Sequence, residues 1–192
     1  MTVVLGLKEN DVVFLGADSQ ASQNVGKATH LKENCSKVFC LDNGIVLAFA
    51  GTARIAQAIG GSDIFCLDEN GTLTKDHIVK NIVPKLVEFV NEPADDESGR
   101  SPVNIIVGYK NCLYYIDDSL WVVKINDYIA SGSGARYVYY NMDINKDLPA
   151  KQKMLKAMIA SAKNIDSVGG PYVIVDTMTN TKEVFDMGGE NH

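Results

Sequence analysis

The feature that most constrains the fold is a set of short runs that are apolar at almost every position. Two of them open the chain, at residues 3–7 and 12–17, and the polar residues 8–11 separate them. A half-exposed strand alternates apolar and polar residues, whereas a continuously apolar strand is covered on both faces. A second pair, at 36–41 and 45–50, flanks the turn sequence Asp42-Asn43-Gly44. The pattern therefore predicts two hairpins that lie in inner layers.

The rest of the chain contains predicted helices and further predicted strands in a regular order. Apolar residues at helical spacing predict helices over 53–59, 75–90, 136–142 and 149–163. The first is stopped by Gly60-Gly61, and Pro84 predicts a kink in the second. Short strands at 103–109, 113–116, 121–125 and 128–130 predict a β-meander, and strands at 172–175 and 183–185 close the chain. This order predicts one α+β domain over 1–192, a four-layer αββα sandwich of two mainly antiparallel sheets, each flanked by a helix pair.

Composition narrows the classes of function. The 192 residues are 46% hydrophobic, which supports a core without disulfides, and the net charge of −6 argues against a nucleic-acid-binding surface. No leader-like segment and no apolar run of about 20 residues is present, so we expect a cytoplasmic protein that does not bind membranes. The cysteines form no CxxC pair and are expected to be buried reduced thiols, and the three histidines do not suggest a triad or a zinc site. The cysteines are Cys35, Cys40, Cys66 and Cys112.

Thr2 directly follows the initiator methionine. If Met1 is removed, Thr2 carries both a hydroxyl nucleophile and a free α-amine, which is a known arrangement of an activated nucleophile. Alone, Thr2 is better explained as a β-forming residue at the start of an edge strand. The rest of the chain has to decide between these interpretations.

The other groups that such a nucleophile needs are present. Asp18 ends the second apolar run, Lys37 precedes the third strand, and Gly51 stands between a strand and a helix start, where its N–H could face an oxyanion. Ser133 lies in the loop Ser131-Gly132-Ser133-Gly134. Each also has an ordinary explanation: a strand-end turn residue, an exposed lysine at a sheet edge, a turn glycine, and a Gly/Ser connector.

In their order, these segments resemble the proteasome β-subunit family of N-terminal nucleophile hydrolases. They are Thr2, Ala17-Asp18-Ser19, Ser36-Lys37-Val38, Ala48-Phe49-Ala50-Gly51 and Gly132-Ser133-Gly134. With Met1 alone ahead of Thr2, the chain is most similar to the bacterial HslV-type peptidases. The resemblance implies the αββα sandwich and extends to the last strands.

The resemblance also implies roles for single residues. Thr2 would be the nucleophile, and Lys37, held by Asp18, would lower the pKa of the Thr2 amine from its usual 7.7–8.0, so that the amine acts as the base. Gly51 N–H would stabilise the oxyanion, and Ser133 would be a further catalytic residue. The substrate pocket would be lined by Ser22, Cys35, Phe49 and Ala53.

The segment before the last strands departs from the family pattern. The family has Asp-x-x-Ser there, whereas this chain has Asp166 one place late and Val168 where the serine is usual. Asp166 is kept as a candidate catalytic aid. No cofactor is required, and by resemblance the carbonyls of Ala162, Ile165 and Val168 could hold a monovalent cation.

These residues predict a threonine endopeptidase subunit of a homo-oligomeric ring complex that degrades unfolded polypeptides and is fed by an ATP-dependent unfoldase. Two alternatives stay open. The first is a structural ring subunit that retains Met1, and the second is a stand-alone amidase that uses the same Thr2 chemistry on a small amide.

Overall fold

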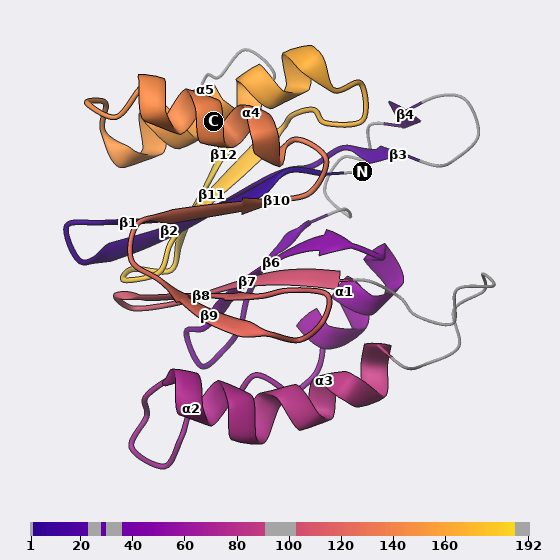
Figure 1. Cartoon of the computed structure of the whole chain (residues 1–192), viewed down its shortest axis with the longest axis vertical. Helices are drawn as coiled ribbons and strands as arrows, with labels where there is room; N and C mark the ends of the chain where they lie inside the picture. The colour runs from indigo at the N-terminus through magenta and orange to yellow at the C-terminus, as the bar shows by residue number, and fades with distance from the viewer. Residues whose placement is uncertain (1, 23–27, 30–35, 91–102, 187–192) are drawn as a thin grey trace.

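The structure is a computed structural model that describes residues 2–22, 28–29, 36–90 and 103–186. Two five-stranded antiparallel sheets are stacked face to face, and helices cover the outer face of each (Figure 1). The predicted four-layer αββα sandwich is therefore confirmed.

The first sheet contains both ends of the described chain. Its order is β10 (Tyr128–Ser131), β1 (Val4–Glu9), β2 (Val12–Asp18), β11 (Tyr172–Asp176) and β12 (Thr181–Phe185). The β1–β2 hairpin turns at Asn10 and Asp11, whose φ angles are 51° and 61°. Positive φ at both central residues is the geometry of a type I′ turn, which matches the twist of the flanking strands. Consequently Asp18 lies in the same sheet as the segment that follows Thr2.

The second sheet contains the predicted second hairpin and most of the meander. Its order is β5 (Val38–Cys40), β6 (Val46–Gly51), β7 (Val103–Tyr109), β8 (Cys112–Ile116) and β9 (Val122–Ile125). Two short strands, β3 (Ala21–Ser22) and β4 (Ala28–Thr29), also pair with each other.

The meander prediction is wrong for β10, which leaves the second sheet and pairs with β1 in the first, Val4 opposite Ser131. The edge of β1 explains the difference. Val4 and Leu5 are fully buried, and a buried strand edge must satisfy its backbone N–H and C=O groups. Pairing with β10 supplies those partners and brings the Gly/Ser loop after Ser131 beside Thr2.

The helices form one pair on each outer face. On the first sheet lie α4 (Ala135–Ile144) and α5 (Ala150–Asn164), and on the second lie α1 (Ala53–Gly60) and the continuous segment α2 (Lys75–His77), η1 (Ile78–Ile82) and α3 (Val83–Val90). The predicted disturbance at Pro84 takes the form of a π-helical turn, in which Val83 N–H bonds to Ile78 O. Pro84 has no N–H to donate, and the wider turn precedes it directly.

The core confirms that the apolar strands are inner layers. Val4, Leu15, Ala48 and Ile106 belong to one buried cluster between the sheets, and two further clusters fill the spaces between each sheet and its helices. At Gly6 a side chain would meet Ile106 at 2.8 Å, so the sheets approach closely there.

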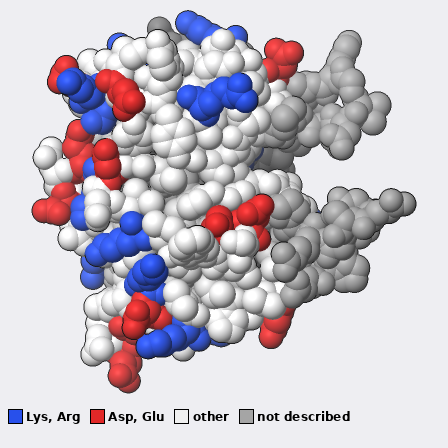
Figure 2. All heavy atoms as spheres, viewed as in Figure 1, with Lys and Arg blue, Asp and Glu red and all other residues white. Residues whose placement is uncertain are grey.

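The surface is mixed in charge. On the face shown in Figure 2, acidic and basic side chains are interspersed. No helix in the described part of the chain has the length and apolar character needed to cross a membrane.

Candidate active site

The Asp18 carboxylate is the centre of the site. It stands at the end of β2, its side chain is 0% exposed, and both of its oxygens accept hydrogen bonds. Oδ1 accepts from Thr2 Oγ1 at 2.9 Å, from Val3 N at 2.9 Å and from Lys37 Nζ at 2.6 Å. A buried carboxylate is tolerated when it is paired and its lone pairs are filled, and these contacts meet both conditions.

Lys37 reaches Asp18 from the other sheet. It lies just before β5, and its carbonyl accepts a hydrogen bond from Phe49 N at 2.9 Å, which ties the segment to β6. Its side chain is 15% exposed and its ammonium forms the ion pair with Asp18. The alternative of a lysine directed into solvent from a sheet edge does not fit this position. The ion pair therefore joins the two sheets at the end where Thr2 lies.

Thr2 is held at its carbonyl as well as at its hydroxyl. Gly134 N and Ser133 Oγ both donate to Thr2 O, each at 3.3 Å. Thr2 is 6% exposed, and the loop that contacts it begins directly after β10. The structure thus brings together Thr2, Asp18, Lys37 and Ser133, although they are up to 131 positions apart in the sequence.

The backbone of Gly132 packs closely against that of Thr2. Its φ is +92°, and a Cβ at this position would lie 2.3 Å from Thr2 O. Only glycine combines the positive φ with this approach at no steric penalty. The sequence shows the glycine, but the close approach to Thr2 depends on the crossing of β10 between the sheets.

We expect Gly132→Ala to destabilise the protein by about 3 kcal/mol or more, because conformational strain adds to the clash with Thr2 O. Gly71→Ala is the matched control, since Gly71 also has positive φ, at +68°, but nothing within 4 Å of a Cβ. There the loss should be about 1 kcal/mol. Urea denaturation measures both, and equal losses in the two variants would contradict the close approach.

Two residues of the site were missed in the sequence. Gln20 N and Gly169 N donate to Asp18 Oδ2, at 3.3 and 3.2 Å, and Gln20 Nε2 donates to Asp166 O at 2.8 Å. Gln20 is 3% exposed, so it links the Asp18 turn to the loop after α5. A buried glutamine has no local sequence signature, whereas the Gly169-Gly170 pair was an available sign of a close backbone approach.

Gly51 occupies the predicted junction between strand and helix. It ends β6 with a φ of +132°, is exposed, and is followed by Thr52, the N-cap of α1, whose side chain makes no capping hydrogen bond. Ala50 packs in the same buried cluster as Val4. The Gly51 N–H therefore lies at the N-terminal, positive end of α1. The role of this N–H in binding an oxyanion stays a prediction.

The predicted pocket residues are spread over different environments. Phe49 is 3% exposed and packs edge-to-face on Phe39, with ring centroids 5.4 Å apart, in the core beneath α1. Ala53 is exposed in the first turn of α1. Met1, Cys35 and the side chain of Ser22 lie outside the described residues, so these predictions stay predictions.

The Asp166 side chain is exposed, and its carbonyl is the atom that joins the site through Gln20. The neighbouring Ser167 Oγ is buried and has no hydrogen-bond partner among the described residues. Ile165 O accepts a hydrogen bond from Val168 N at 3.0 Å. An unpartnered buried hydroxyl beside backbone carbonyls is compatible with a bound cation or water, because both use oxygen ligands.

The charge of Asp18 also affects Tyr172, which lies opposite Asp18 on the neighbouring strand β11. Burial raises the pKa of the Tyr172 phenol above its usual value, and the negative charge of Asp18 raises it further. The phenol thus remains neutral beside the carboxylate.

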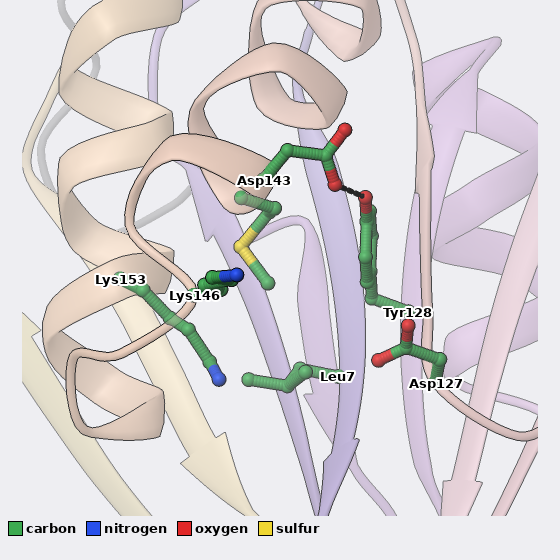
Figure 3. A pocket seen from close by; sticks show the side chains of 7 residues that line it. Leu7, Asp127, Tyr128, Asp143, Lys146 and Lys153 are labelled. Carbon is green, nitrogen blue, oxygen red and sulfur yellow. Dashed lines mark hydrogen bonds between the residues drawn. The ribbon is translucent and has the colours of Figure 1, made fainter.

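A separate pocket of about 440 Å³ lies toward the other end of β1 (Figure 3). Leu7, Tyr128 and Lys153 line it, and Tyr128 donates a hydrogen bond of 2.6 Å to Asp143 at its rim. The Lys153 ammonium pairs with Glu9. None of the residues that donate hydrogen bonds to Asp18 lines this pocket.

Comparison with known proteins identifies the fold. The model of the proteasome subunit family matches residues 2–62. No curated protein matches the sequence. Among solved structures, BPH of Thiobacillus denitrificans, in complex with epoxomicin, has a TM-score of 0.71 at 18% identity, over 91% of this chain and 97% of that chain.

Two further structures are similar to the chain at comparable levels. Eukaryotic HslV from Trypanosoma brucei has a TM-score of 0.65 at 18% identity, over 91% of this chain and 98% of that chain. Anbu, an ancestral beta-subunit from Yersinia bercovieri, has a TM-score of 0.74 at 14% identity, over 97% of this chain and 88% of that chain.

Proposed function

From a chain that is proteasome-like in fold and matches the proteasome subunit family over residues 2–62, we propose an N-terminal threonine endopeptidase subunit that acts after Met1 is removed. The observation that carries the proposal is the Asp18 carboxylate, on which the Thr2 hydroxyl and the Lys37 ammonium converge at 2.9 and 2.6 Å. A nucleophile, a fixed cation and an orienting carboxylate are what activation of an N-terminal threonine requires.

The mechanism begins at Thr2. Its Oγ attacks the carbonyl carbon of a peptide bond while the free α-amine accepts the hydroxyl proton, directly or through water. The Lys37 charge disfavours a second positive charge nearby and so keeps the amine neutral. Asp18 holds Lys37 and orients the Thr2 hydroxyl through the same oxygen, Oδ1.

The remaining residues act on the intermediate. The Gly51 N–H stabilises the tetrahedral oxyanion, the leaving amine takes a proton, and water then hydrolyses the acyl-enzyme.

Ser133 holds the Thr2 carbonyl, while Ser22, Cys35, Phe49 and Ala53 line the substrate pocket. Asp166 contributes through its backbone carbonyl, which accepts the hydrogen bond from Gln20 Nε2 and so ties this loop to the Asp18 turn. The carbonyls of Ala162, Ile165 and Val168 with Ser167 Oγ are the oxygen ligands that would hold a monovalent cation, whose charge would steady this loop.

The assembly is proposed from likeness. The chain forms homo-oligomeric rings in the cytoplasm and receives unfolded polypeptides from an ATP-dependent unfoldase. The similarity to eukaryotic HslV and to the ancestral beta-subunit Anbu supports a ring subunit. A closed chamber would also restrict a peptidase of low selectivity to unfolded chains.

The test is the intact mass of the protein purified from its native host, followed by reaction with a peptide electrophile directed at N-terminal threonine. We expect the mass to lack Met1 and one adduct to form at Thr2. Quantitative retention of Met1 would reject the peptidase and favour the structural ring subunit.

Light scattering separates the peptidase from the stand-alone amidase. A ring gives a mass many times that of one chain, whereas an amidase of this fold can act as a monomer. A monomer that cleaves a small amide but leaves unfolded casein intact would overturn the proposal.

A further inference from the structure

The two oxygens of the Asp18 carboxylate have different kinds of partner. Oδ1 accepts hydrogen bonds from Thr2 Oγ1 and Lys37 Nζ, the groups of the proposed chemistry. Oδ2 accepts from backbone N–H groups, Gln20 N at 3.3 Å and Gly169 N at 3.2 Å. The terminal torsion of a carboxylate is soft, so hydrogen bonds fix its orientation. The direction of Oδ1 therefore depends on the donors that hold Oδ2.

One of those donors comes from a distant segment. Gly169 stands in the loop at residues 165–171, between α5 and β11, and is 151 positions from Asp18. The same glycine accepts a hydrogen bond at its carbonyl oxygen from Ser19 N, at 3.2 Å. Both bonds are longer than the usual N–H···O distance of about 2.9–3.0 Å. Backbone bonds of this length hold a loop only weakly.

A shorter contact between this loop and the Asp18 turn is made by a side chain. Gln20 Nε2 donates to Asp166 O at 2.8 Å, and Gln20 is 3% exposed. Gln20 therefore has two separate attachments, its backbone N–H to Asp18 and its side-chain amide to the loop. Because the side chain is buried and its amide is bonded to the protein, it is not a group that a substrate would contact.

A buried polar side chain bonded to a backbone carbonyl often has a structural role only. Thr177 is an example in this chain: it is 3% exposed, and its Oγ1 donates to Val13 O at 3.0 Å and to Lys110 O at 2.6 Å. These partners lie near the start of β2 and in the turn between β7 and β8, at the other end of β2 from Asp18. Gln20 differs because the loop that it holds supplies a donor to the carboxylate of the site.

We propose, on the premise of the proposed peptidase function, that Gln20 is a positioning residue of the reaction. Its amide holds the 165–171 loop in place, so that Gly169 N–H stays on Asp18 Oδ2. Oδ1 then stays directed at the Thr2 hydroxyl. Without the amide the loop shifts, Oδ2 loses a donor, and the carboxylate turns away from the nucleophile. A misplacement of about 1 Å in an active site lowers a rate by as much as about 100-fold.

The experiment measures kcat and KM for hydrolysis of fluorescently labelled casein by the full chain without Met1. Gln20→Met removes the donor and keeps a side chain of similar length. Its kcat should fall by about 10-fold and its KM should change by less than about twofold, because the lost bond acts on the reacting groups and not on the substrate. Gln20→Glu should lose at least as much, since an ionised carboxylate facing the Asp166 carbonyl oxygen has no hydrogen to donate.

Thr177→Val is the matched control, because it also removes a buried donor to backbone carbonyls. It should lower Tm about as much as Gln20→Met does and leave kcat unchanged. Amide hydrogen exchange supplies a measurement that does not depend on activity. In Gln20→Met the Gly169 amide should exchange about 10-fold faster, while the Thr177 amide, bonded to Val13 O at 3.0 Å, should exchange as in the wild type.

The outcomes separate the positioning role from the peptidase function. If a folded wild-type chain without Met1 leaves casein intact, the proposed function is rejected and the positioning role with it. If the wild type is active and folded Gln20→Met has an unchanged kcat, the positioning role alone is rejected. A lower kcat with unchanged exchange at Gly169 also rejects it, since the effect would not pass through the loop. Lower kcat, unchanged KM and faster exchange together are the result that a merely structural glutamine does not produce.

Discussion

The chain with Thr2→Ala is expected to lose hydrolysis of unfolded polypeptides by about 10³-fold or more while it keeps its fold, because no other group replaces the missing nucleophile. The structural effect should be small. The substitution removes one hydrogen bond, from Thr2 Oγ1 to Asp18, in a cluster whose other donors remain. Its loss lowers the free energy of unfolding by about 1 kcal/mol.

The measurement is the rate of casein hydrolysis, with circular dichroism as the check on folding and intact mass as the check that Met1 has been removed. Thr2→Ser keeps a hydroxyl and is the matched control, with activity well above that of Thr2→Ala. Ser133→Ala should have a smaller effect, because Ser133 Oγ contacts only the Thr2 carbonyl at 3.3 Å. Persistent hydrolysis in a folded, processed Thr2→Ala chain would place the nucleophile elsewhere.

Asp18→Asn is expected to cause a large loss of stability. Removal of one partner leaves the charge of Lys37 uncompensated at a position that is only 15% exposed. It also leaves the N–H groups of Val3, Gln20 and Gly169 with a weaker acceptor whose amide hydrogens oppose them. Breaking a buried ion pair in this way lowers stability by about 3–5 kcal/mol.

Urea denaturation of Asp18→Asn and Asp76→Asn separates burial from charge. Asp76 pairs with Lys80 at 3.2 Å, but both side chains are more than two-thirds exposed, at 84% and 71%. The loss there should be about 0.5 kcal/mol or less, because exposed ion pairs are screened by water. Similar losses in the two variants would show that the Asp18 cluster does not stabilise the fold.

Much of the fold follows from local patterns. The runs at 3–7 and 12–17 were apolar on both faces, and β1 and β2 are indeed covered on both sides. Gly60-Gly61 ended the first helix as predicted. These features could be predicted because strand burial and helix termination depend on residues that are close in the sequence.

The candidate site could be predicted only in part. Asp18 and Lys37 were identified because they follow and precede apolar strands, but their pairing needed the two sheets to be stacked. Gln20 was missed because a buried amide donor has no sequence signature, and Gly169 was missed although the Gly169-Gly170 pair is a sign of a close backbone approach.

The exposure of the cysteines was also not predicted. The expectation that they are buried was wrong, since Cys40 is exposed and Cys66 and Cys112 are partly exposed. The reason is that the exposure of a side chain in a loop or at a sheet edge depends on how the sheets and helices pack.

The sequence by itself determined the layers, the order of the strands and helices, and the residue types at the site, since each depends on short-range apolar periodicity and on single side chains. The tertiary structure decided which of them meet. The crossing of β10 to the free edge of β1 sets Gly132, Ser133 and Gly134 against Thr2, and the loop after α5 brings Gly169 to Asp18, 151 positions away. These contacts are long-range, and they form because buried strand edges and a buried carboxylate must have hydrogen-bond partners.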